Sequence, residues 1–235
     1  MPGVSPSAHR FDAIFLDVGG VLVLPHHDTI TGHFADAGFE IDRERLLEAH
    51  YRGVLAIDDA KAGPEEFGDY HREFAAAAGI LEADLARGIA VLEGVWQTTH
   101  LWREPLPWAA EGLAALAELD LPLVIVSNAD GTVERLLADA DICQVGPGPG
   151  VELAGVIDSG VVGVAKPDPA IFRLALEVAG VPAERAVHIG DTYEYDVVGA
   201  RAAGVHPVLM DPLALRPDVD CDRIASLTEA VAMLG

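Results

Sequence analysis

Apolar residues gather in four short runs along the chain, without regular alternation with polar residues. The runs span residues 11–16, 121–126, 186–189 and 206–210, are rich in Val, Ile and Leu, and stop at polar or Gly residues. Such runs are typical of strands that are buried on both faces of a parallel sheet. We therefore predict four parallel strands at these positions.

Patterns of helical periodicity lie between and after these runs. They cover residues 109–119, 133–140, 169–179 and 196–203. The third pattern is followed by Gly180 and Pro182 and the fourth by Gly204, which are typical helix stops. Strands that alternate with helices predict an α/β fold with a Rossmann-like, right-handed parallel sheet.

The long interval from residue 25 to about residue 105 contains no convincing strand. It shows helical patterns instead, at about residues 29–37, 42–52, 64–78 and 82–101. We predict a helical insertion after the first strand. The expected division is a core formed by residues 1–24 and 104–235 and a helical part formed by residues 25–103.

The charge of the chain limits its partners. Lys and Arg number 15 and Asp and Glu 38, which gives a net charge of −23 for 235 residues, of which 51% are hydrophobic. This composition supports a folded core, and the negative field disfavours binding to nucleic acid or to a membrane surface. A small anionic substrate remains compatible with it, provided that a metal ion or a buried Lys supplies local positive charge.

The cysteine content and the hydropathy suggest a compartment. Cys143 and Cys221 are the only cysteines, and neither lies in a CxxC motif. The beginning, MPGVSPSAHRF, lacks an apolar stretch of signal-peptide length, and no apolar run approaches the roughly 18 residues of a membrane helix. We expect a cytoplasmic protein.

Polar residues with chemical potential follow the predicted strands. In open parallel sheets, ligands bind beyond the carboxyl ends of the strands. The residues expected at that edge are Asp17, Ser127, Asn128, Asp191, Asp196 and, in the loop before residue 169, Lys166. Each alone is equally compatible with a turn or a helix cap, but together they indicate a site.

This set of residues suits phosphoryl transfer. A carboxylate such as Asp17 can attack phosphorus and form an aspartyl-phosphate. Because the phosphate repels that carboxylate, a cation is required, and Mg²⁺ suits an oxygen-only site. Asp191 and the carbonyl of Gly19 can complete such a site, Ser127 can hold phosphate oxygens, and Lys166 can neutralise developing charge.

The ordered motifs FLDVGGV, VIVSN, KPDPAIF and HIGDTYEYDVVGARAAG resemble those of the haloacid dehalogenase superfamily. The resemblance covers the chain after about its first ten residues, and the helical interval resembles an all-helical type 1 cap. It implies a hydrolase with Asp17 as nucleophile, phosphate contacts from Ser127 and Asn128, Lys166 as charge clamp, Mg²⁺ held by Asp17, the Gly19 carbonyl and Asp191, and Asp196 in support.

The chain departs from the family pattern at one position. Family phosphatases usually carry a second Asp two residues after the nucleophile, where it serves as general acid and base; here that residue is Gly19. Loss of such a group typically lowers the rate by about 10²–10⁴-fold. His26 and His27 are the nearest replacements in sequence, since histidine titrates near neutral pH, although solvated loop residues are the alternative interpretation.

Three functions follow from these observations. The first is a Mg²⁺-dependent phosphatase that acts on small phosphorylated metabolites. The second is a non-catalytic protein that binds phosphate or a partner, which Gly19 favours. The third is a 2-haloacid dehalogenase, which is disfavoured because Asp191 retains a metal carboxylate and no Arg closely follows the first strand. The sequence defines neither the physiological substrate nor the oligomeric state.

Overall fold

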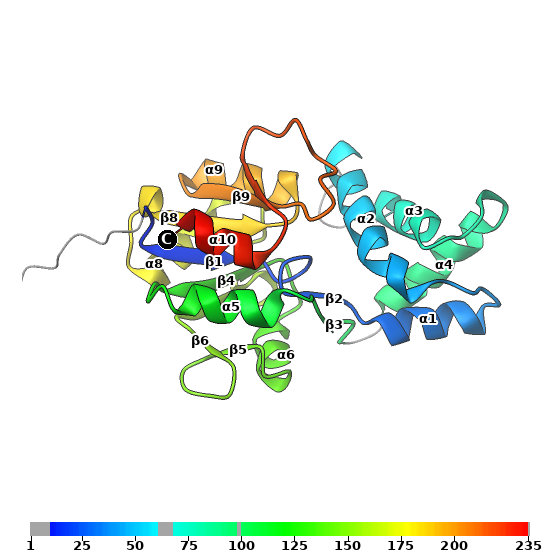
Figure 1. Cartoon of the computed structure of the whole chain (residues 1–235), viewed down its shortest axis with the longest axis horizontal. Coiled ribbons are helices and arrows are strands. Elements are labelled where there is room, and N and C mark those ends of the chain that lie inside the picture. The colour runs from blue at the N-terminus through cyan, green and yellow to red at the C-terminus, as the bar shows by residue number, and fades with distance from the viewer. Residues whose placement is uncertain (1–9, 61–67, 98–99, 235) are drawn as a thin grey trace, which may run out of the picture.

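A six-stranded parallel sheet forms the centre of the larger of two lobes (Figure 1). The computed structural model describes residues 10–60, 68–97 and 100–234. The strand order is β10-β9-β8-β1-β4-β7, and every neighbouring pair is parallel. The strands are β1 (Ala13–Leu16), β4 (Leu123–Ser127), β7 (Gly155–Asp158), β8 (Ala186–Gly190), β9 (His206–Met210) and β10 (Asp222–Ile224). The predicted Rossmann-like α/β class is confirmed.

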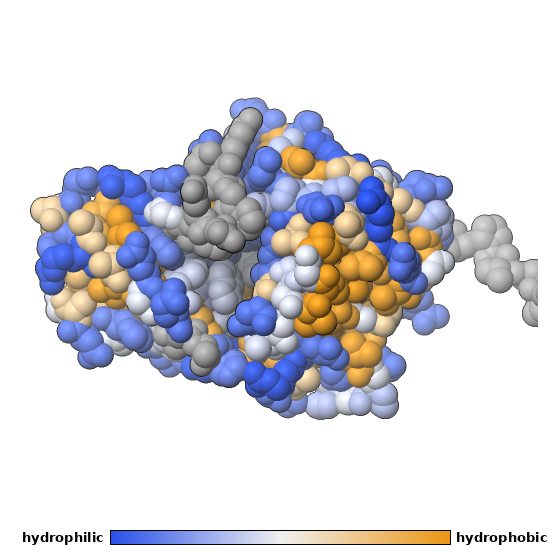
Figure 2. Space-filling model, turned by 180° about the vertical axis from the view of Figure 1, so that it is seen from behind, coloured by the Kyte–Doolittle hydropathy of each residue, from blue (hydrophilic) through white to orange (hydrophobic). Residues whose placement is uncertain are grey.

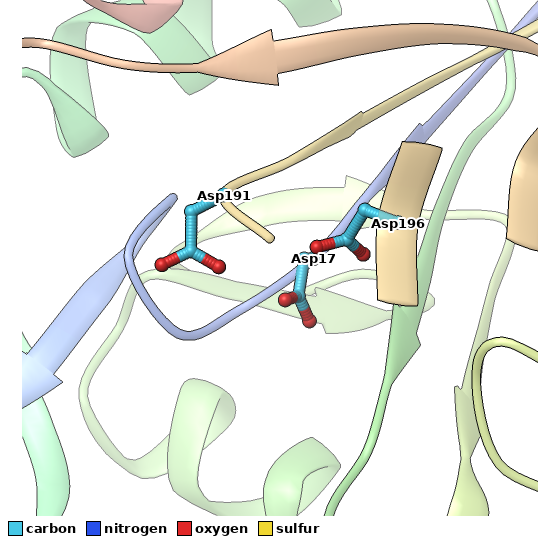
Figure 3. A group of neighbouring side chains, drawn as sticks. All are labelled: Asp17, Asp191 and Asp196. Carbon is cyan, nitrogen blue, oxygen red and sulfur yellow. The ribbon is translucent and has the colours of Figure 1, made fainter. Parts of the chain in front are cut away.

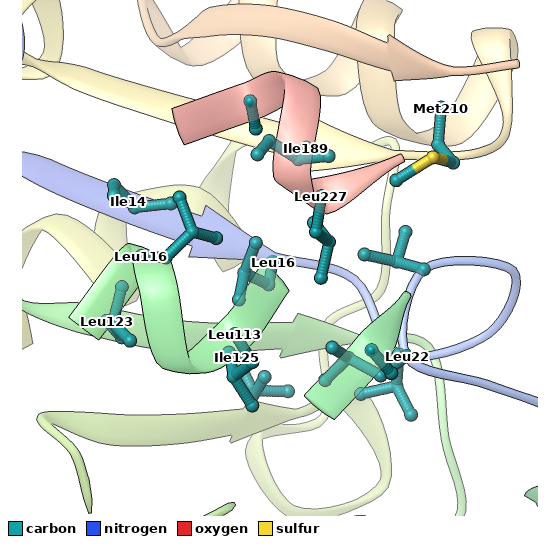
Figure 4. Close-up of a cluster of buried hydrophobic side chains, with 14 of the residues drawn as sticks. Ile14, Leu16, Leu22, Leu113, Leu116, Leu123, Ile125, Ile189, Met210 and Leu227 are labelled. Atoms are coloured by element: carbon teal, nitrogen blue, oxygen red, sulfur yellow. The ribbon is translucent and has the colours of Figure 1, made fainter. Parts of the chain in front are cut away.

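Helices cover both faces of this sheet because its central strands are apolar on both sides. Ile14 and Leu16 of β1 pack with Leu113 of α5 (Ala109–Ala117) and Leu227 of α10 (Leu227–Leu234) (Figure 4). Phe15 points to the opposite face, in the cluster formed with α8 (Pro169–Ala179) and α9 (Gly199–Ala203). Burying one such side chain contributes about 1.5–3 kcal/mol.

The remaining core elements are short. They are α6 (Val133–Asp139), a two-stranded sheet of β5 (Cys143–Val145) and β6 (Val151–Leu153), α7 (Ser159–Val162), the 3-10 turn η3 (Ala183–Arg185) and the π-helical turn η4 (Tyr193–Val198). Of these, η4 directly follows β8 and leads into α9. It therefore lies at the carboxyl edge of the sheet.

The smaller lobe, which we call the helical insert, lies between β2 (Val23–Pro25) and β3 (Trp102–Pro105). It comprises α1 (His27–Asp36), the 3-10 turn η1 (Arg43–Arg45), α2 (Leu46–Ala60), α3 (Gly68–Ala77), the 3-10 turn η2 (Glu82–Asp84) and α4 (Leu85–Trp96). Its helices share a hydrophobic cluster that includes Phe34, Phe74 and Leu92. Since β2 and β3 pair antiparallel, the two chain segments that join the lobes run side by side.

Several strands differ from the prediction. We expected no strand before about residue 105, yet β3 begins at Trp102 and alternates between half-buried and exposed residues. Its residues WREP have neither the apolar content nor the β-branching of the other strands, and pairing with β2 supplies the order instead.

Parts of the helices predicted at 64–78 and 82–101 fall outside the described residues.

On the face seen in Figure 2, hydrophilic residues border both lobes, and the largest gathering of apolar residues lies on the core lobe. Large hydrophobic side chains that are exposed in the described part of the chain are Leu81, Val145, Val161 and Val178. Among the described helices, none has the length and apolar character needed to cross a membrane.

Candidate active site

Three carboxylates from two adjacent strand ends converge at the carboxyl edge of the sheet (Figure 3). Asp17 directly follows β1, Asp191 directly follows β8, and Asp196 lies on η4. One oxygen of each lies within 4.8 Å of the others. The meeting follows from topology, because β1 and β8 are parallel neighbours and therefore end side by side.

Lys166 lies between two of these acids. Its Nζ is 2.9 Å from Asp17 Oδ1 and 2.6 Å from Asp196 Oδ1, and the side chain is only 2% exposed. Burial alone would lower the pKa of Lys166, but the two carboxylates raise it above its ordinary value. The lysine therefore stays charged and restrains Asp17.

Lys166 alone does not balance the negative charge around Asp17. Burial raises the pKa of Asp17 to about 7; Lys166 opposes the shift, and Asp196 and Asp191 add to it. One lysine thus does not compensate three clustered carboxylates. A divalent cation at this place would favour the ionised, nucleophilic form of Asp17.

Asp196 uses both of its oxygens on protein donors. Oδ1 accepts hydrogen bonds from Lys166 Nζ and, at 2.8 Å, from His188 Nε2, while Oδ2 accepts from the backbone N–H and the hydroxyl of Thr192. Although burial would raise it, Lys166 and His188 lower the pKa of Asp196. Asp196 thus lies against Lys166, and its supporting role, toward the metal shell or toward Lys166, stays a prediction.

The carboxylate oxygens that these contacts leave free fit Mg²⁺. Within the described residues, no hydrogen bond or ion pair engages Asp17 Oδ2 or Asp191 Oδ1, so each acid retains one uncommitted oxygen. Oxygen ligands from one or two carboxylates, a carbonyl and waters are the set that Mg²⁺ prefers. Gly19 can offer only its backbone, and a Cβ there would lie 3.1 Å from Cζ3 of Trp102.

The residues predicted to contact phosphate lie beside this centre. Ser127 is the last residue of β4, the strand next to β1, and is 5% exposed. The Asn128 amide donates to the Lys166 carbonyl at 3.0 Å and accepts from the Lys166 N–H at 2.7 Å. Asn128 therefore fastens the Lys166 loop, and direct phosphate contact by either residue stays a prediction.

His26 and His27 lie at the beginning of α1, where the insert joins the core. Nδ1 of His26 bonds the hydroxyl of Thr29 at 2.9 Å, and both rings face Glu104 of β3 at 3.8–3.9 Å. Burial lowers the pKa of His27 despite the opposing carboxylate of Glu104. Within the described residues, the polar contacts of the two rings are with Thr29 of α1 and with Arg103 and Glu104 of β3, and an acid–base role stays a prediction.

Two side chains of the insert that contact the site were not predicted. His50 of α2 is 2% exposed, and its Nε2 lies 2.9 Å from Asp191 Oδ2, while Nδ1 lies 2.9 Å from the Tyr70 hydroxyl. The next residue, Tyr51, donates to the Gly20 carbonyl at 2.6 Å. A usable sequence signal was present, since a histidine on an otherwise apolar helix face is unusual unless it has a buried partner.

A Rossmann-like sheet that carries a carboxylate paired with a buried lysine and further acids at its carboxyl edge fits the class of hydrolytic enzymes. The family follows from comparison. The model of the haloacid dehalogenase-like hydrolases matches residues 11–204. The chain belongs to this family.

Known relatives agree with this assignment. Haloacid dehalogenase-like hydrolase domain-containing protein 3 of Xenopus laevis is 34% identical over 136 residues, which cover 57% of this chain and 52% of the relative. Phosphoserine phosphatase of Thermus thermophilus is 39% identical over 117 residues, 49% of this chain and 44% of that protein. The chain thus spans about half the length of these curated relatives.

The fold also has solved counterparts. The magnesium-bound crystal structure of YfnB from Bacillus subtilis superimposes with a TM-score of 0.61 at 20% identity, covering 96% of this chain and 99% of that one. At this identity the likeness concerns the fold, and it includes both lobes because nearly all of each chain is covered.

Proposed function

We propose that this protein is a Mg²⁺-dependent phosphatase of small phosphorylated metabolites that acts through an aspartyl-phosphate. The observation that carries the proposal is the position of Lys166, which neutralises one oxygen of Asp17 and leaves the other, Oδ2, uncommitted at the sheet edge. The similarity to a phosphoserine phosphatase supports phosphoester chemistry rather than dehalogenation.

The first chemical step is attack by a carboxylate oxygen of Asp17 on phosphorus. The bond from phosphorus to the ester oxygen breaks, and the leaving alkoxide then takes a proton from water, unless its alcohol is acidic enough to leave as the anion. Lys166 binds Asp17 Oδ1 and so holds the carboxylate in a fixed orientation for the attack. In the second step a water attacks the phosphorus of the acyl-phosphate, which releases inorganic phosphate and restores the Asp17 carboxylate.

Mg²⁺ would be held by Asp17, Asp191 and the Gly19 carbonyl, and it would supply positive charge against the phosphate dianion. The residues of this chain then have separate tasks. Asp196 keeps Lys166 in place, Asn128 fixes the backbone of the Lys166 loop, and Ser127 is available to a phosphate oxygen at the end of β4.

The residue at position 19 determines which esters react well. Glycine has no proton to give to a departing alkoxide, and the Trp102 ring occupies the adjacent space. Phosphoesters with poor leaving groups therefore react slowly, whereas esters of acidic alcohols, which leave without a proton, react faster. We also propose that the insert, residues 25–103, serves as the cap that excludes water during the reaction.

The test is phosphate release by the purified chain from a panel of phosphomonoesters, with and without Mg²⁺. We expect release that requires the metal and is lost in Asp17→Asn. Asp139→Asn is the matched control, because Asp139 is an exposed acid on α6.

Two other results would overturn the proposal. Halide release from a 2-haloacid without metal would identify a dehalogenase. Failure of the folded protein to release phosphate from any ester, while it still binds phosphate and Mg²⁺, would identify a binding protein. The expectation that nucleic acid and membranes are not partners stays a prediction from charge.

A further inference from the structure

One helix of the insert reaches the loops that carry the proposed metal ligands. In Figure 1, α2 is the insert helix that faces the core loops at the carboxyl edge of the sheet. From this helix, His50 contacts Asp191, Tyr51 contacts Gly20, and Asp58 accepts hydrogen bonds from the backbone N–H groups of Tyr193 and Glu194.

His50 contacts Asp191, whose carboxylate is also a proposed ligand of the metal ion. A carboxylate can only accept hydrogen bonds, so Nε2 of His50 must carry the hydrogen that lies between it and Asp191 Oδ2. The Tyr70 hydroxyl bonds the other ring nitrogen and thereby holds the plane of the imidazole. His50, Tyr70 and Asp191 are 2%, 1% and 4% exposed, so water does not compete for these bonds.

The backbone beside this pair is shaped to admit it. Gly20 has a φ of +64°, and a Cβ at this residue would lie 1.9 Å from Asp191 Oδ2 and 2.7 Å from His50 Nε2. A side chain at position 20 would therefore separate the two groups. The loop after β1 leaves a gap at Gly20, and the contact between the insert and Asp191 passes through it.

We propose that His50 is a positioning residue, which fixes Asp191 Oδ2 and so presents the uncommitted Oδ1 toward the cation, with Tyr70 fixing His50 in turn. The inference rests on the proposed function, since it concerns the same metal site. It makes the affinity for Mg²⁺ depend on the docking of the insert. By linkage, bound Mg²⁺ stabilises that docking to the same extent.

Side chains that hydrogen-bond a metal ligand and so orient it typically weaken metal binding by about 10–100-fold when they are removed. The test is isothermal titration calorimetry of the full chain with Mg²⁺ alone, without substrate. We expect His50→Ala to weaken Mg²⁺ binding by about 10-fold or more. His50→Gln retains an N–H donor at similar reach and should recover part of that loss, while Tyr70→Phe should weaken binding by a smaller factor.

Tyr51→Phe is the matched control. It removes the neighbouring contact of α2 with the core, at the Gly20 carbonyl, but leaves Asp191 untouched. We expect Mg²⁺ affinity within about twofold of the unaltered protein. Circular dichroism and the thermal midpoint establish that each variant is folded. If His50→Ala does not fold, the comparison of His50→Gln and Tyr70→Phe with the unaltered protein provides the test.

Three outcomes would overturn the inference: unchanged affinity in folded His50→Ala, an equal loss in Tyr51→Phe, or no recovery in His50→Gln. These differ from failure of the proposed function. If the unaltered protein binds no Mg²⁺, both proposals fail. If it binds Mg²⁺ in the expected order among variants but releases no phosphate, only the proposed function fails.

Discussion

Gly19 lies against the indole of Trp102, so closely that a Cβ at Gly19 would be 3.1 Å from the ring. At the position that usually carries an acid in the family, the side chain is therefore absent and the space for it is also taken. The first residue of β3, from the segment that returns from the insert, fills the adjacent space. The missing side chain at Gly19 and the indole of Trp102, 83 residues later, are therefore matched in space.

Restoring the acid should consequently need two changes. We expect Gly19→Asp alone to destabilise the protein by about 1–3 kcal/mol, because the added side chain is forced against the ring. Gly19→Asp with Trp102→Leu should hydrolyse alkyl phosphates about 10-fold or more faster than the unaltered protein, since general acid catalysis can return. Thermal unfolding and kcat on an alkyl phosphate measure the two effects.

A stable and fully active Gly19→Asp single variant would contradict this expectation. Trp102→Leu alone is the control for the change in packing. An aryl phosphate serves as the reference substrate, because its leaving group gains little from an added acid.

Lys166→Met should affect both stability and turnover. Removal of the buried ammonium leaves Asp17 and Asp196 facing one another, and breaking a buried ion pair typically costs about 3–5 kcal/mol. We expect phosphate release to fall by about 10²–10³-fold, the usual loss when a charge-stabilising group is removed. Urea unfolding and steady-state kinetics test these two expectations.

Arg173→Met, on the exposed side of α8, provides a comparison for the loss of one positive charge. If Lys166→Met remained as stable and active as this control, the place of Lys166 at the centre of the site would be wrong.

The contact between Asp58 and Arg216 should contribute to the joining of the lobes. Arg216 lies in the loop between β9 and β10, which reaches toward α2 (Figure 1). Its side chain is 5% exposed, and that of Asp58 is 8% exposed. We expect Asp58→Ala to lower the free energy of unfolding by about 3–5 kcal/mol, because the buried charge of Arg216 is then left without its partner.

Asp58→Ala with Arg216→Met should cost less than the sum of the two single changes, since neither charge is then left alone. A double-mutant cycle in urea measures this coupling. Additive effects would show that the ion pair contributes nothing beyond its separate parts.

Acid should destabilise the fold partly through His188. Burial lowers the pKa of His188 below its ordinary value of 6.5, although Asp196 opposes the shift. The unfolded chain therefore takes up a proton before the folded one does. Stability from this group is complete above pH 6.5 and is lost as pH falls through the lower, folded-state pKa, with a slope of at most about 1.4 kcal/mol per pH unit.

His188→Gln retains a donor to Asp196 but does not titrate in this range. Between pH 7.5 and 5, its free energy of unfolding should depend less on pH than that of the unaltered protein, in parallel urea titrations. Coincident slopes would assign the acid sensitivity to other groups.

The sequence was sufficient for the centre of the fold because the central strands are apolar on both faces. β1, β4, β8 and β9 all lie within two residues of the predicted runs at their amino ends, and Asp17 and Asp191 follow their strands as expected. Once the strands are parallel and β1 lies beside β8, the approach of these acids needs no further information.

Other features depend on contacts that no local pattern encodes. β3 and β10 are short, carry charged residues and are ordered by pairing with a neighbour. The bond between His50 and Asp191 joins residues 141 positions apart, on an insert whose docking cannot be deduced from helical periodicity. The same applies to Trp102, whose place beside Gly19 follows from the path of the returning chain.

The adjacent contacts of His50 and Tyr51 bear on how such proteins can be recombined. Exchanging the insert for that of another family member would alter more than the walls around the substrate, because the foreign helix would also have to meet Asp191 and the Gly20 carbonyl. Chimeras that keep the contact of His50 with Asp191 should retain a competent centre, whereas those that lack it would change substrate selectivity and metal binding together.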